Sequence, residues 1–414
     1  MKRILLNVNL ELMKYLIWPL VLVIFGAVFI SGFLLYFGNS ETLEFQSEAA
    51  ENIDAHPDIK ILSLQIKNQD IEFQKPLENP PKIIKALYAT SWSASSAKKL
   101  NYLIDLIKKT ELNAIVIDIK DYSGNVTYQT EIEKVNEYKA TEKRILRPNE
   151  MIKRLHDEGI YVIARQAVFQ DQQFAKARPD LALQNKITGK SWKDRKGLMW
   201  MDSASKEVWD YNIAIAKDAL NRGFDEINFD YIRFASDGDV GAIKYPIYDE
   251  TIPKQEIMRQ FFEYLRNQLV DAKISADIFG MVLIMKDGQG IGQYFENVLP
   301  YFDAVAPMVY PSHYASGFSG FKNPANYPYE VVKYSLEIAA SRMAAMNTAT
   351  STAGIKLARI RPWLQDFDLG AVYDAQKVRG QIQAVYDVLN ENNYDGFMLW
   401  DPANNYTPQA LLAE

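Results

Sequence analysis

The chain contains no cysteine and only three histidines in 414 residues. Without cysteine it can form no disulfide, no thiolate nucleophile and no cysteine-bound metal site. The histidines do not occur in a His-x-x-x-His or His-Glu-x-x-His spacing. We therefore expect no metal site, and we expect no organic cofactor either, because no nucleotide-binding or phosphate-loop pattern is present.

Long runs of basic residues are also missing, and the formal net charge is −6. Nucleic acids and anionic lipid surfaces both require a concentrated positive patch on a protein that binds them. We expect neither as a partner, whereas a glycan is compatible with this composition. Hydrophobic residues make up 48% of the chain, which is enough for one large buried core.

Charge is absent from the stretch Tyr15 to Phe37, which follows a short basic segment containing Lys2, Arg3 and Lys14. This stretch is longer than the apolar region of a signal peptide, ~7–15 residues, and is long enough to span a bilayer. The positive-inside rule predicts residues 1–14 in the cytoplasm, residues 15–37 as a single membrane-spanning helix, and the remainder outside. We expect an uncleaved anchor; a cleaved signal peptide is the alternative.

Residues 38–81 are polar and acidic, so we interpret them as a flexible extracytoplasmic spacer. Beyond them, apolar strand-like runs alternate with helical patterns. The runs are Ile83–Ala89, Ala114–Ile119, Tyr161–Phe169, Glu226–Phe234, Lys273–Phe279, Ala304–Tyr310, Lys356–Arg361 and Gly396–Trp400. Eight such runs predict an α/β domain, a (β/α)8 TIM barrel over residues 82–414. A doubly wound open sheet would show the same alternation.

Polar residues share one face of several predicted strands. Asp118 and Lys120 alternate with isoleucines in the second run, and Asp230 and Asp277 alternate with apolar residues in the fourth and fifth. Residues two apart on a barrel strand point to the same side. We therefore expect a charged inner face near the C-terminal strand ends, where catalytic residues of this fold lie.

The two best candidates for catalytic residues are Asp230, which ends the fourth run, and Asp277 on the neighbouring fifth run. A pair of carboxylates is what glycoside hydrolysis requires, and Asp230 fits the nucleophile or transition-state stabiliser. The alternative interpretation is structural ion pairing, for example of Asp230 with Arg233 or Lys120.

Other charged, polar and aromatic residues near the strand ends are candidate substrate-binding residues. Aromatic faces pack on sugar rings, and charged groups bind hydroxyls. The candidates are Asp118, Lys120, Asp121, Arg165, Arg233, Tyr310, His313, Arg361, Trp363, Gln365, Trp400 and Asp401. Alternatives remain for several of them. Arg165 and Arg361 would serve equally as interstrand salt bridges, the tryptophans as core residues, and the residues 118–121 as anchors of their own loop.

Five motifs occur in the same order as in a known family, and they are Ile117–Gly124, Glu226–Phe234, Ser275–Gly280, Pro307–Tyr314 and Arg361–Phe367. Together they resemble the glycoside hydrolase-like family of bacterial TIM-barrel domains of unknown function. The resemblance covers residue 82 to the C-terminus. It implies a (β/α)8 barrel and glycosidase activity.

The segment 223–230 also partly resembles the fourth-strand motif of chitinase-type barrels. Ile232 stands where that motif has its acidic Glu, so a substrate-assisted chitinase mechanism is not expected. A resemblance to amylase-like barrels implies Asp230 as the nucleophile and Asp277 as the acid.

The leading hypothesis is therefore a membrane-anchored glycoside hydrolase that acts on a cell-envelope or extracellular polysaccharide. The alternatives are a non-catalytic glycan-binding barrel and a transglycosylase.

Overall fold

The computed structural model describes residues 69–350 and 355–413. The expected membrane-spanning stretch 15–37 and the expected spacer up to residue 68 lie outside the described residues. Within the described ranges, no helix combines the length and the apolar character that crossing a membrane demands.

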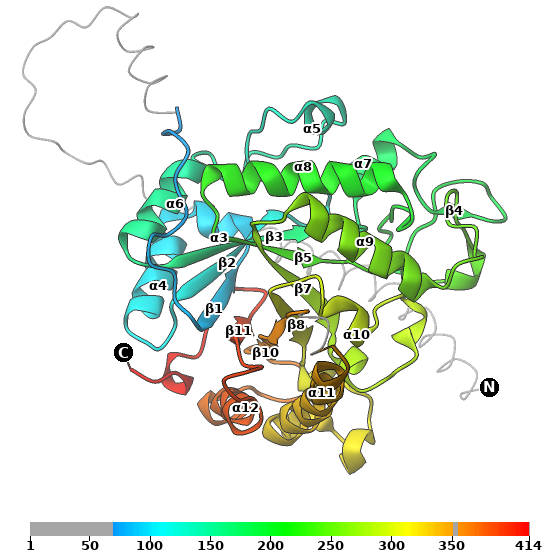
Figure 1. Ribbon diagram of the computed structural model, residues 1–414. Coiled ribbons are helices and arrows are strands. Elements are labelled where there is room, and N and C mark those ends of the chain that lie inside the picture. The colour runs from blue at the N-terminus through cyan, green and yellow to red at the C-terminus, as the bar shows by residue number, and fades with distance from the viewer. Residues whose placement is uncertain (1–68, 351–354, 414) are drawn as a thin grey trace, which may run out of the picture. The chain divides into compact units, whose positions relative to one another are not determined.

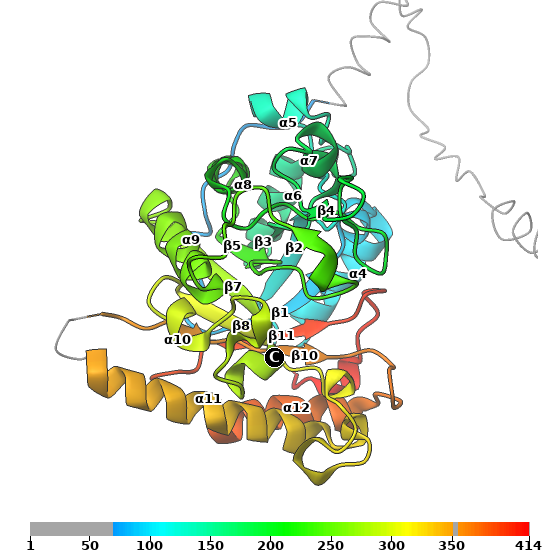
Figure 2. The ribbon, with the colours of Figure 1, turned by 90° about the vertical axis from the view of Figure 1, so that its right-hand side faces the viewer.

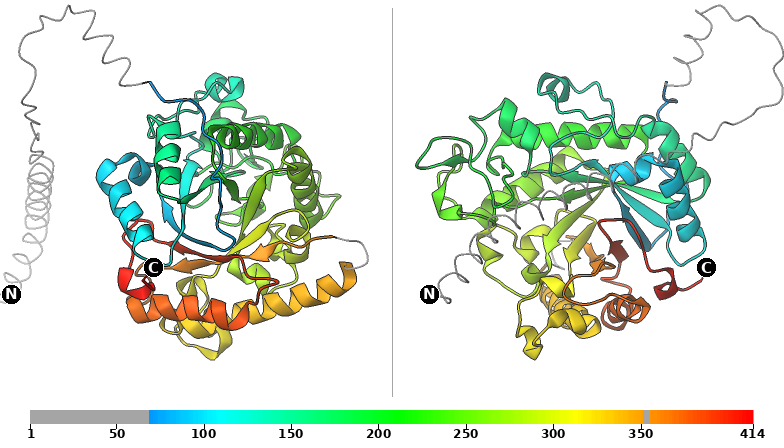
Figure 3. Two further views of the ribbon diagram at one scale, coloured as in Figure 1. Left: turned by 60° about the vertical axis from the view of Figure 1, so that its left-hand side comes forward. Right: turned by 180° about the vertical axis from the view of Figure 1, so that it is seen from behind.

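Parallel strands form a closed barrel (Figures 1 and 3). In chain order they are β1 (Ile84–Ala89), β2 (Ala114–Lys120), β3 (Tyr161–Ala167), β5 (Glu226–Asp230), β7 (Lys273–Phe279), β8 (Ala304–Met308), β9 (Arg359–Ile360), β10 (Trp363–Gln365) and β11 (Gly396–Trp400). From β1 to β9 each strand pairs with the next, β10 pairs with β8 and with β11, and β11 pairs with β1. The ring is therefore closed, which confirms the predicted TIM barrel and excludes the open sheet.

Helices cover the outside of the barrel (Figures 1 and 2). The longer ones are α4 (Ala97–Lys108), α6 (Pro148–Asp157), α8 (Lys206–Arg222), α9 (Lys254–Gln268), α11 (Pro328–Thr350) and α12 (Ala375–Val388), and the shorter ones are α3 (Ser91–Ser95), α5 (Glu133–Glu137), α7 (Gln172–Ala177) and α10 (Phe295–Val298). Side chains of Ser96, Ser205 and Asp374 accept backbone hydrogen bonds at three helix starts. The outward-facing isoleucines of β2 are completely buried beneath this layer.

The seventh barrel position differs from the prediction of one strand over residues 356–361. It consists of two short strands, β9 and β10, separated by Arg361 and Pro362. Proline has no backbone N–H and cannot continue a strand ladder at that point. The segment 356–361 therefore supplies only the N-terminal part of the seventh strand position, and β10 supplies its C-terminal part.

This break changes the position of Arg361, which we predicted near the C-terminal strand ends. Its guanidinium instead binds Glu226, which begins β5, with Nη1–Oε1 and Nη2–Oε2 distances of 2.8 and 3.1 Å. It also binds Asp395, which precedes β11, at 2.5 Å from Nη2. Arg361 thus lies at the N-terminal end of the barrel, and the prediction that it lines the mouth was wrong.

Residues 69–81, the last part of the expected spacer, and Lys82 lie against this N-terminal end. The backbone N–H of Leu77 donates to Asp225 Oδ1 at 2.6 Å, and that of Gln74 donates to the carbonyl of Arg222 at 3.1 Å. Gln74 passes so close to Gly223 that a Cβ there would meet its backbone at 2.8 Å. Glycine also suits the φ of +107° with which Gly223 ends α8.

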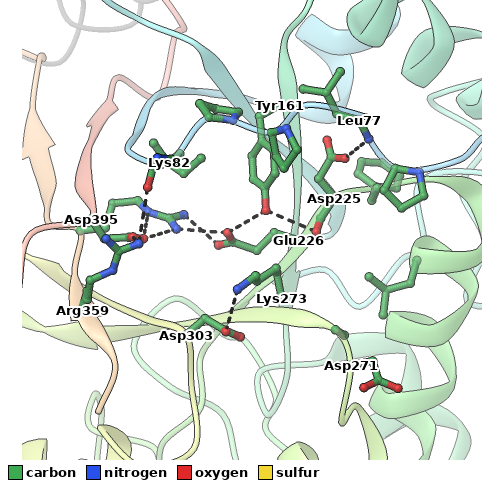
Figure 4. Close-up of a pocket in the computed structure, with 18 of the residues that line it drawn as sticks. Leu77, Lys82, Tyr161, Asp225, Glu226, Asp271, Lys273, Asp303, Arg359 and Asp395 are labelled. Atoms are coloured by element: carbon green, nitrogen blue, oxygen red, sulfur yellow. Dashed lines mark hydrogen bonds and ion pairs between the residues drawn. The ribbon is translucent and has the colours of Figure 1, made fainter. Parts of the chain in front are cut away.

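A pocket of about 1000 Å³ lies between this segment and the strand starts (Figure 4). Its charged groups are largely paired with one another, as Lys273 is with Asp303 at 3.2 Å and Arg359 is with Asp395. Residues at this end of a TIM barrel generally serve stability rather than catalysis. We therefore look for the functional site at the opposite end.

The Arg361 cluster predicts a large loss of stability on replacement of Arg361 by methionine. The change leaves two buried carboxylates, Glu226 and Asp395, without this cation, and breaking a buried pair in this way costs about 3–5 kcal/mol. Urea denaturation of Arg361→Met should show this loss. Arg178→Met, which removes exposed ion pairs with Asp180 and Glu207, should cost about 0–1 kcal/mol. Equal losses in the two variants would contradict the assignment.

Candidate active site

Arg165, on the inner face of β3, lies among three carboxylates at the C-terminal end of the barrel. Its Nη1 donates to Asp118 Oδ1 at 2.6 Å, and its Nη2 donates to Asp230 Oδ2. Its Nε lies 3.6 Å from Asp277 Oδ2. The carboxylates come from β2, β5 and β7, so the predicted alternation places all three on the inner face. The structure thus brings together four of the candidate residues.

Two aromatic rings support the Arg165 guanidinium. Its centre lies 4.9 Å from the ring centroid of Trp400 and 5.6 Å from that of Tyr88. These two rings stack on each other with centroids 3.9 Å apart, and the Tyr88 hydroxyl donates to Asp118. Cation–π contacts of this kind hold the guanidinium in place. Sequence reasoning missed Tyr88, although its spacing of two residues from Ala86 and four from Ile84 along β1 places it on the same, inner face.

The carboxylates Asp230 and Asp277 have different surroundings. Each oxygen of Asp230 accepts one hydrogen bond, Oδ2 from Arg165 and Oδ1 from the backbone N–H of Tyr231 at 2.5 Å. Tyr231 has a φ of +53°, a strained conformation that is often found at functional sites.

Asp277 is 1% exposed and accepts hydrogen bonds at Oδ1 from Asn228 at 2.8 Å and from Trp363 at 2.7 Å. Burial, followed by the charge of Asp230, raises the pKa of Asp277 to about 8. Asp277 therefore retains its proton near neutral pH, which is the property that the acid of a catalytic carboxylate pair requires.

A family model described as "Putative glycosyl hydrolase domain" matches residues 86–406 of this chain. The chain belongs to this family. The match begins within β1 and extends beyond β11, so it includes all three carboxylates around Arg165, and it confirms the resemblance drawn from the five motifs. No curated protein matches the chain.

Solved structures of several proteins are similar to this glycosyl hydrolase-family domain. A hypothetical protein from Ruminiclostridium thermocellum ATCC 27405 is 38% identical over 46% of this chain and 96% of its own, with a TM-score of 0.43. The glycoside hydrolase domain of PgaB (BpsB) from Bordetella bronchiseptica is 13% identical over 78% of this chain and 95% of its own, with a TM-score of 0.51. Alpha-L-fucosidase isoenzyme 2 from Paenibacillus thiaminolyticus is 11% identical over 79% and 48%, with a TM-score of 0.50. The last two likenesses concern the fold.

We predicted that Lys120 shares the inner face of the barrel with Asp118, and this prediction was wrong. The pairing of β2 with β3 shifts between the two residues, and such a bulge turns the next side chain away. Lys120 is fully buried outside the barrel, where its Nζ lies 2.8 Å from Asp171 and donates to the carbonyl of Ala167 at 2.7 Å. Lys120 therefore fastens the loop after β3 and does not reach the mouth.

Asp121 and Asp401 are engaged within their own loops. Asp121 binds Arg144 and accepts the backbone N–H of Ser123 at 2.9 Å. Asp401 accepts the backbone N–H of Ala403 at 2.6 Å, and burial raises the pKa of Asp401. For Asp121 the loop-anchoring alternative agrees with these contacts.

The candidate residues on β10 are buried and support the site, whereas those that follow β8 lie at the mouth of the barrel. Trp363 is 1% exposed and donates to Asp277, so it is a core residue that supports the carboxylate and not the floor of a sugar subsite. Gln365 is completely buried, and it accepts the backbone N–H of Ser312 at 3.2 Å. Tyr310 is buried, and its ring centroid lies 5.3 Å from that of His313. The charges of Asp277, Arg165 and Asp230 all act on the Tyr310 hydroxyl.

Exposed aromatic residues on the rim of the mouth were also missed. Trp92 in α3, just after β1, is 59% exposed, and Tyr122, just after β2, is 52% exposed. The guanidinium of Arg144 lies 5.2 Å from the Trp92 ring centroid. Nothing in the sequence distinguishes these two residues from aromatics of the core.

In the described ranges, no group of three or more His, Asp or Glu side chains is arranged to hold a metal ion.

The raised pKa of Asp277 predicts a pH dependence of stability. Because the folded chain binds this proton more tightly than the unfolded chain does, the contribution is present below the unfolded value of about 4 and is lost as the pH rises to about 8. Relative to Asp277→Asn, the wild type should lose more than about 1.4 kcal/mol of unfolding free energy across this range, the equivalent of one pKa unit.

Urea denaturation at several pH values from 4 to 9 measures this difference. Asp105→Asn, at an exposed position of α4, is the matched control and should run parallel to the wild type. A constant difference between wild type and Asp277→Asn would show that the pKa of Asp277 is not raised.

Proposed function

We propose that the barrel domain hydrolyses O-glycosidic bonds in a cell-envelope or extracellular polysaccharide, with Asp230 and Asp277 as the catalytic carboxylates. The observation that carries the proposal is the pair of strand-end carboxylates in different electrostatic states beside Arg165. Glycosidases require one carboxyl group that keeps its proton near neutral pH and a second that is ionised.

Asp277 fits the general acid. Its Oδ1 accepts two hydrogen bonds, whereas its Oδ2 accepts none from the described residues and lies 3.6 Å from Arg165 Nε. Oδ2 can therefore carry the proton and deliver it to the oxygen of the leaving sugar. Its raised pKa keeps that proton bound at neutral pH.

Asp230 fits the ionised partner. Its oxygens face a guanidinium and a backbone N–H, and both donors stabilise negative charge. The carboxylate would attack the anomeric carbon or stabilise the oxocarbenium-like transition state while the bond to the leaving oxygen breaks. Water then supplies the hydroxyl of the new reducing end, and its proton returns to Asp277.

Aromatic residues around the mouth suit sugar rings. Trp400 is half-buried and lies beside Arg165, and the hydroxyl of Tyr310 donates no hydrogen bond within the described part of the chain. Trp92 and Tyr122 extend the aromatic surface to the rim. Aromatic rings inside the mouth and at its rim would bind several sugar units of one chain, which favours a polysaccharide over a monosaccharide as substrate.

Replacement of either carboxylate by the isosteric amide tests this function. Asp230→Asn and Asp277→Asn should each lower kcat on a polysaccharide hydrolysed by the wild type by about 10²- to 10⁴-fold, because a general acid or its partner is lost. Binding should remain within about threefold, since the amide preserves shape and most hydrogen bonds. Reducing-end release and binding are measured on the same panel of polysaccharides. Asp387→Asn, on the exposed face of α12, is the control.

The alternatives give different results in the same assay. A glycan-binding barrel would bind without releasing product, and both variants would weaken its binding. A transglycosylase would form new linkages in place of reducing ends, which product analysis detects. Either result would overturn the hydrolase.

We also propose that residues 15–37 anchor the domain in the membrane as a single pass, with residues 1–14 in the cytoplasm. The proposal is supported by the uncharged stretch and by the basic residues before it.

The full-length chain should stay with the membrane fraction during alkaline carbonate extraction, while a variant lacking residues 1–37 should be released. Protease added to intact cells or spheroplasts should digest the barrel domain, because the proposal places this domain in the extracytoplasmic space. Release of the full-length chain by carbonate would refute the anchor.

A further inference from the structure

Arg233, three residues beyond Asp230, is a buried arginine at the mouth of the barrel. It is 8% exposed, and its guanidinium centre lies 4.7 Å from the ring centroid of Trp200 and 4.6 Å from that of Phe279. The ring of Tyr231 lies at 5.5 Å. These aromatic residues come from the segments that follow β3 and β5 and from the end of β7. Arg233 is thus enclosed by aromatic rings beside the proposed catalytic residues.

Within the described ranges, one nitrogen of the Arg233 guanidinium donates hydrogen bonds and the other two donate none. Nη1 donates to the carbonyl of Phe234 at 3.1 Å and to Ser236 Oγ at 2.9 Å. Nε and Nη2 donate to no residue of the ranges 69–350 and 355–413, and both remain accessible to solvent. No carboxylate in these ranges lies within 4.0 Å of the guanidinium. The edge formed by Nε and Nη2 is therefore available to a ligand.

The nearby acidic residues are already bound to other groups. Asp230 binds Arg165, and Asp194 accepts hydrogen bonds from Gln170 at 3.0 Å and from Trp200 at 3.2 Å. Asp237 lies 3.4 Å from Arg195.

Every other buried arginine in the described ranges has a carboxylate partner. Arg222 binds Asp218, and Arg342 binds Glu296. Arg165 and Arg361 each bind at least two carboxylates. Those partners raise the pKa of Arg165 and of Arg361, whereas burial lowers the pKa of Arg233. A buried cation without a counter-ion costs free energy, which an anionic ligand would recover.

We propose that the Nε–Nη2 edge of Arg233 binds the carboxylate of a uronic acid residue in the substrate, in a subsite next to Asp230. Two parallel N–H donors on a planar guanidinium match the two oxygens of a planar carboxylate. The surrounding rings exclude water and pack against the sugar that carries the carboxylate. This inference rests on the proposed hydrolase function and names its substrate class as acidic polysaccharides.

Carboxyl reduction provides a matched pair of substrates. Converting the uronic acid units of a polysaccharide to the corresponding neutral sugars removes the charge and leaves the linkages and ring stereochemistry unchanged. The full-length protein in detergent is assayed on a panel of uronic acid-containing polysaccharides and on the reduced form of each. We expect kcat/KM on the hydrolysed polysaccharide to exceed that on its reduced form by about 10- to 100-fold, as for a charge-assisted bidentate contact.

Two variants test whether Arg233 causes this preference. In Arg233→Gln the ratio of the two kcat/KM values should fall to near 1, and in Arg233→Lys it should fall by about 10-fold, because an ammonium group lacks the two-donor edge. Arg195→Gln removes the same charge from an exposed position nearby and should leave the ratio unchanged. The ratio does not depend on the amount of folded enzyme, so a loss of stability in a variant cannot imitate the effect.

The outcomes separate the inference from the function. Hydrolysis of both forms at similar kcat/KM by the wild type, or a ratio that Arg233→Gln leaves unchanged, would overturn the uronic acid subsite while the hydrolase stands. A preference for sulfated or phosphorylated glycans over uronic acid-containing ones would overturn it as well. Hydrolysis of no polysaccharide in either form would overturn the function and the subsite together.

Discussion

The structure of the mouth depends on one buried interaction, the contact of the Arg165 guanidinium with Asp118, Asp230 and Asp277. Three carboxylates could not be buried together at neighbouring strand ends without a cation, because their mutual repulsion is poorly screened there. One guanidinium does not balance three negative charges. At least one carboxyl is therefore driven to keep its proton. Burial raises the pKa of Asp118 as well as that of Asp277, and the pKa of Asp277, the least exposed of the three, reaches about 8. In the proposed hydrolase, this charge imbalance would prepare an acid and an ionised partner in the same cavity.

The opposite end of the barrel shows what a balanced cluster looks like. There Glu226 and Asp395 face two cations, Arg361 and Arg359, so the charges match in number. Neither carboxylate is left without a partner, and the segment 69–82 covers this end. Both ends of the barrel thus bury arginine among carboxylates. The matched cluster stabilises the fold, and the unmatched one is suited to proton transfer.

The count of eight strand-like runs predicted the barrel. Alternation along the strands then placed Asp118, Asp230 and Asp277 on one face, because burial on a closed barrel imposes a period of two. The prediction failed where the backbone breaks that period. A bulge turns Lys120 outward, and Pro362 divides the seventh strand and leaves Arg361 at the lower end. Trp363 and Gln365 lie on β10 but point into the protein. No local pattern in the sequence predicts that these two side chains are buried, because their burial depends on contacts with residues distant in sequence, such as Asp277 and Ser312.

The unmatched charge at the mouth bears on how an acidic substrate would be accommodated. With Asp277 protonated, the two arginines Arg165 and Arg233 equal in number the remaining carboxyl groups, Asp118 and Asp230, and burial raises the pKa of Asp118 as well. The mouth therefore carries no net negative charge before substrate binds. A carboxylate bound by Arg233 would add one negative charge near Asp230 and Asp277. Like charges favour the protonated form of a neighbouring carboxyl, so this carboxylate would strengthen proton binding by Asp277. By linkage, protonation of Asp277 would equally strengthen binding of the acidic sugar. Substrate would therefore bind best to the form of the site that holds the proton needed to cleave it.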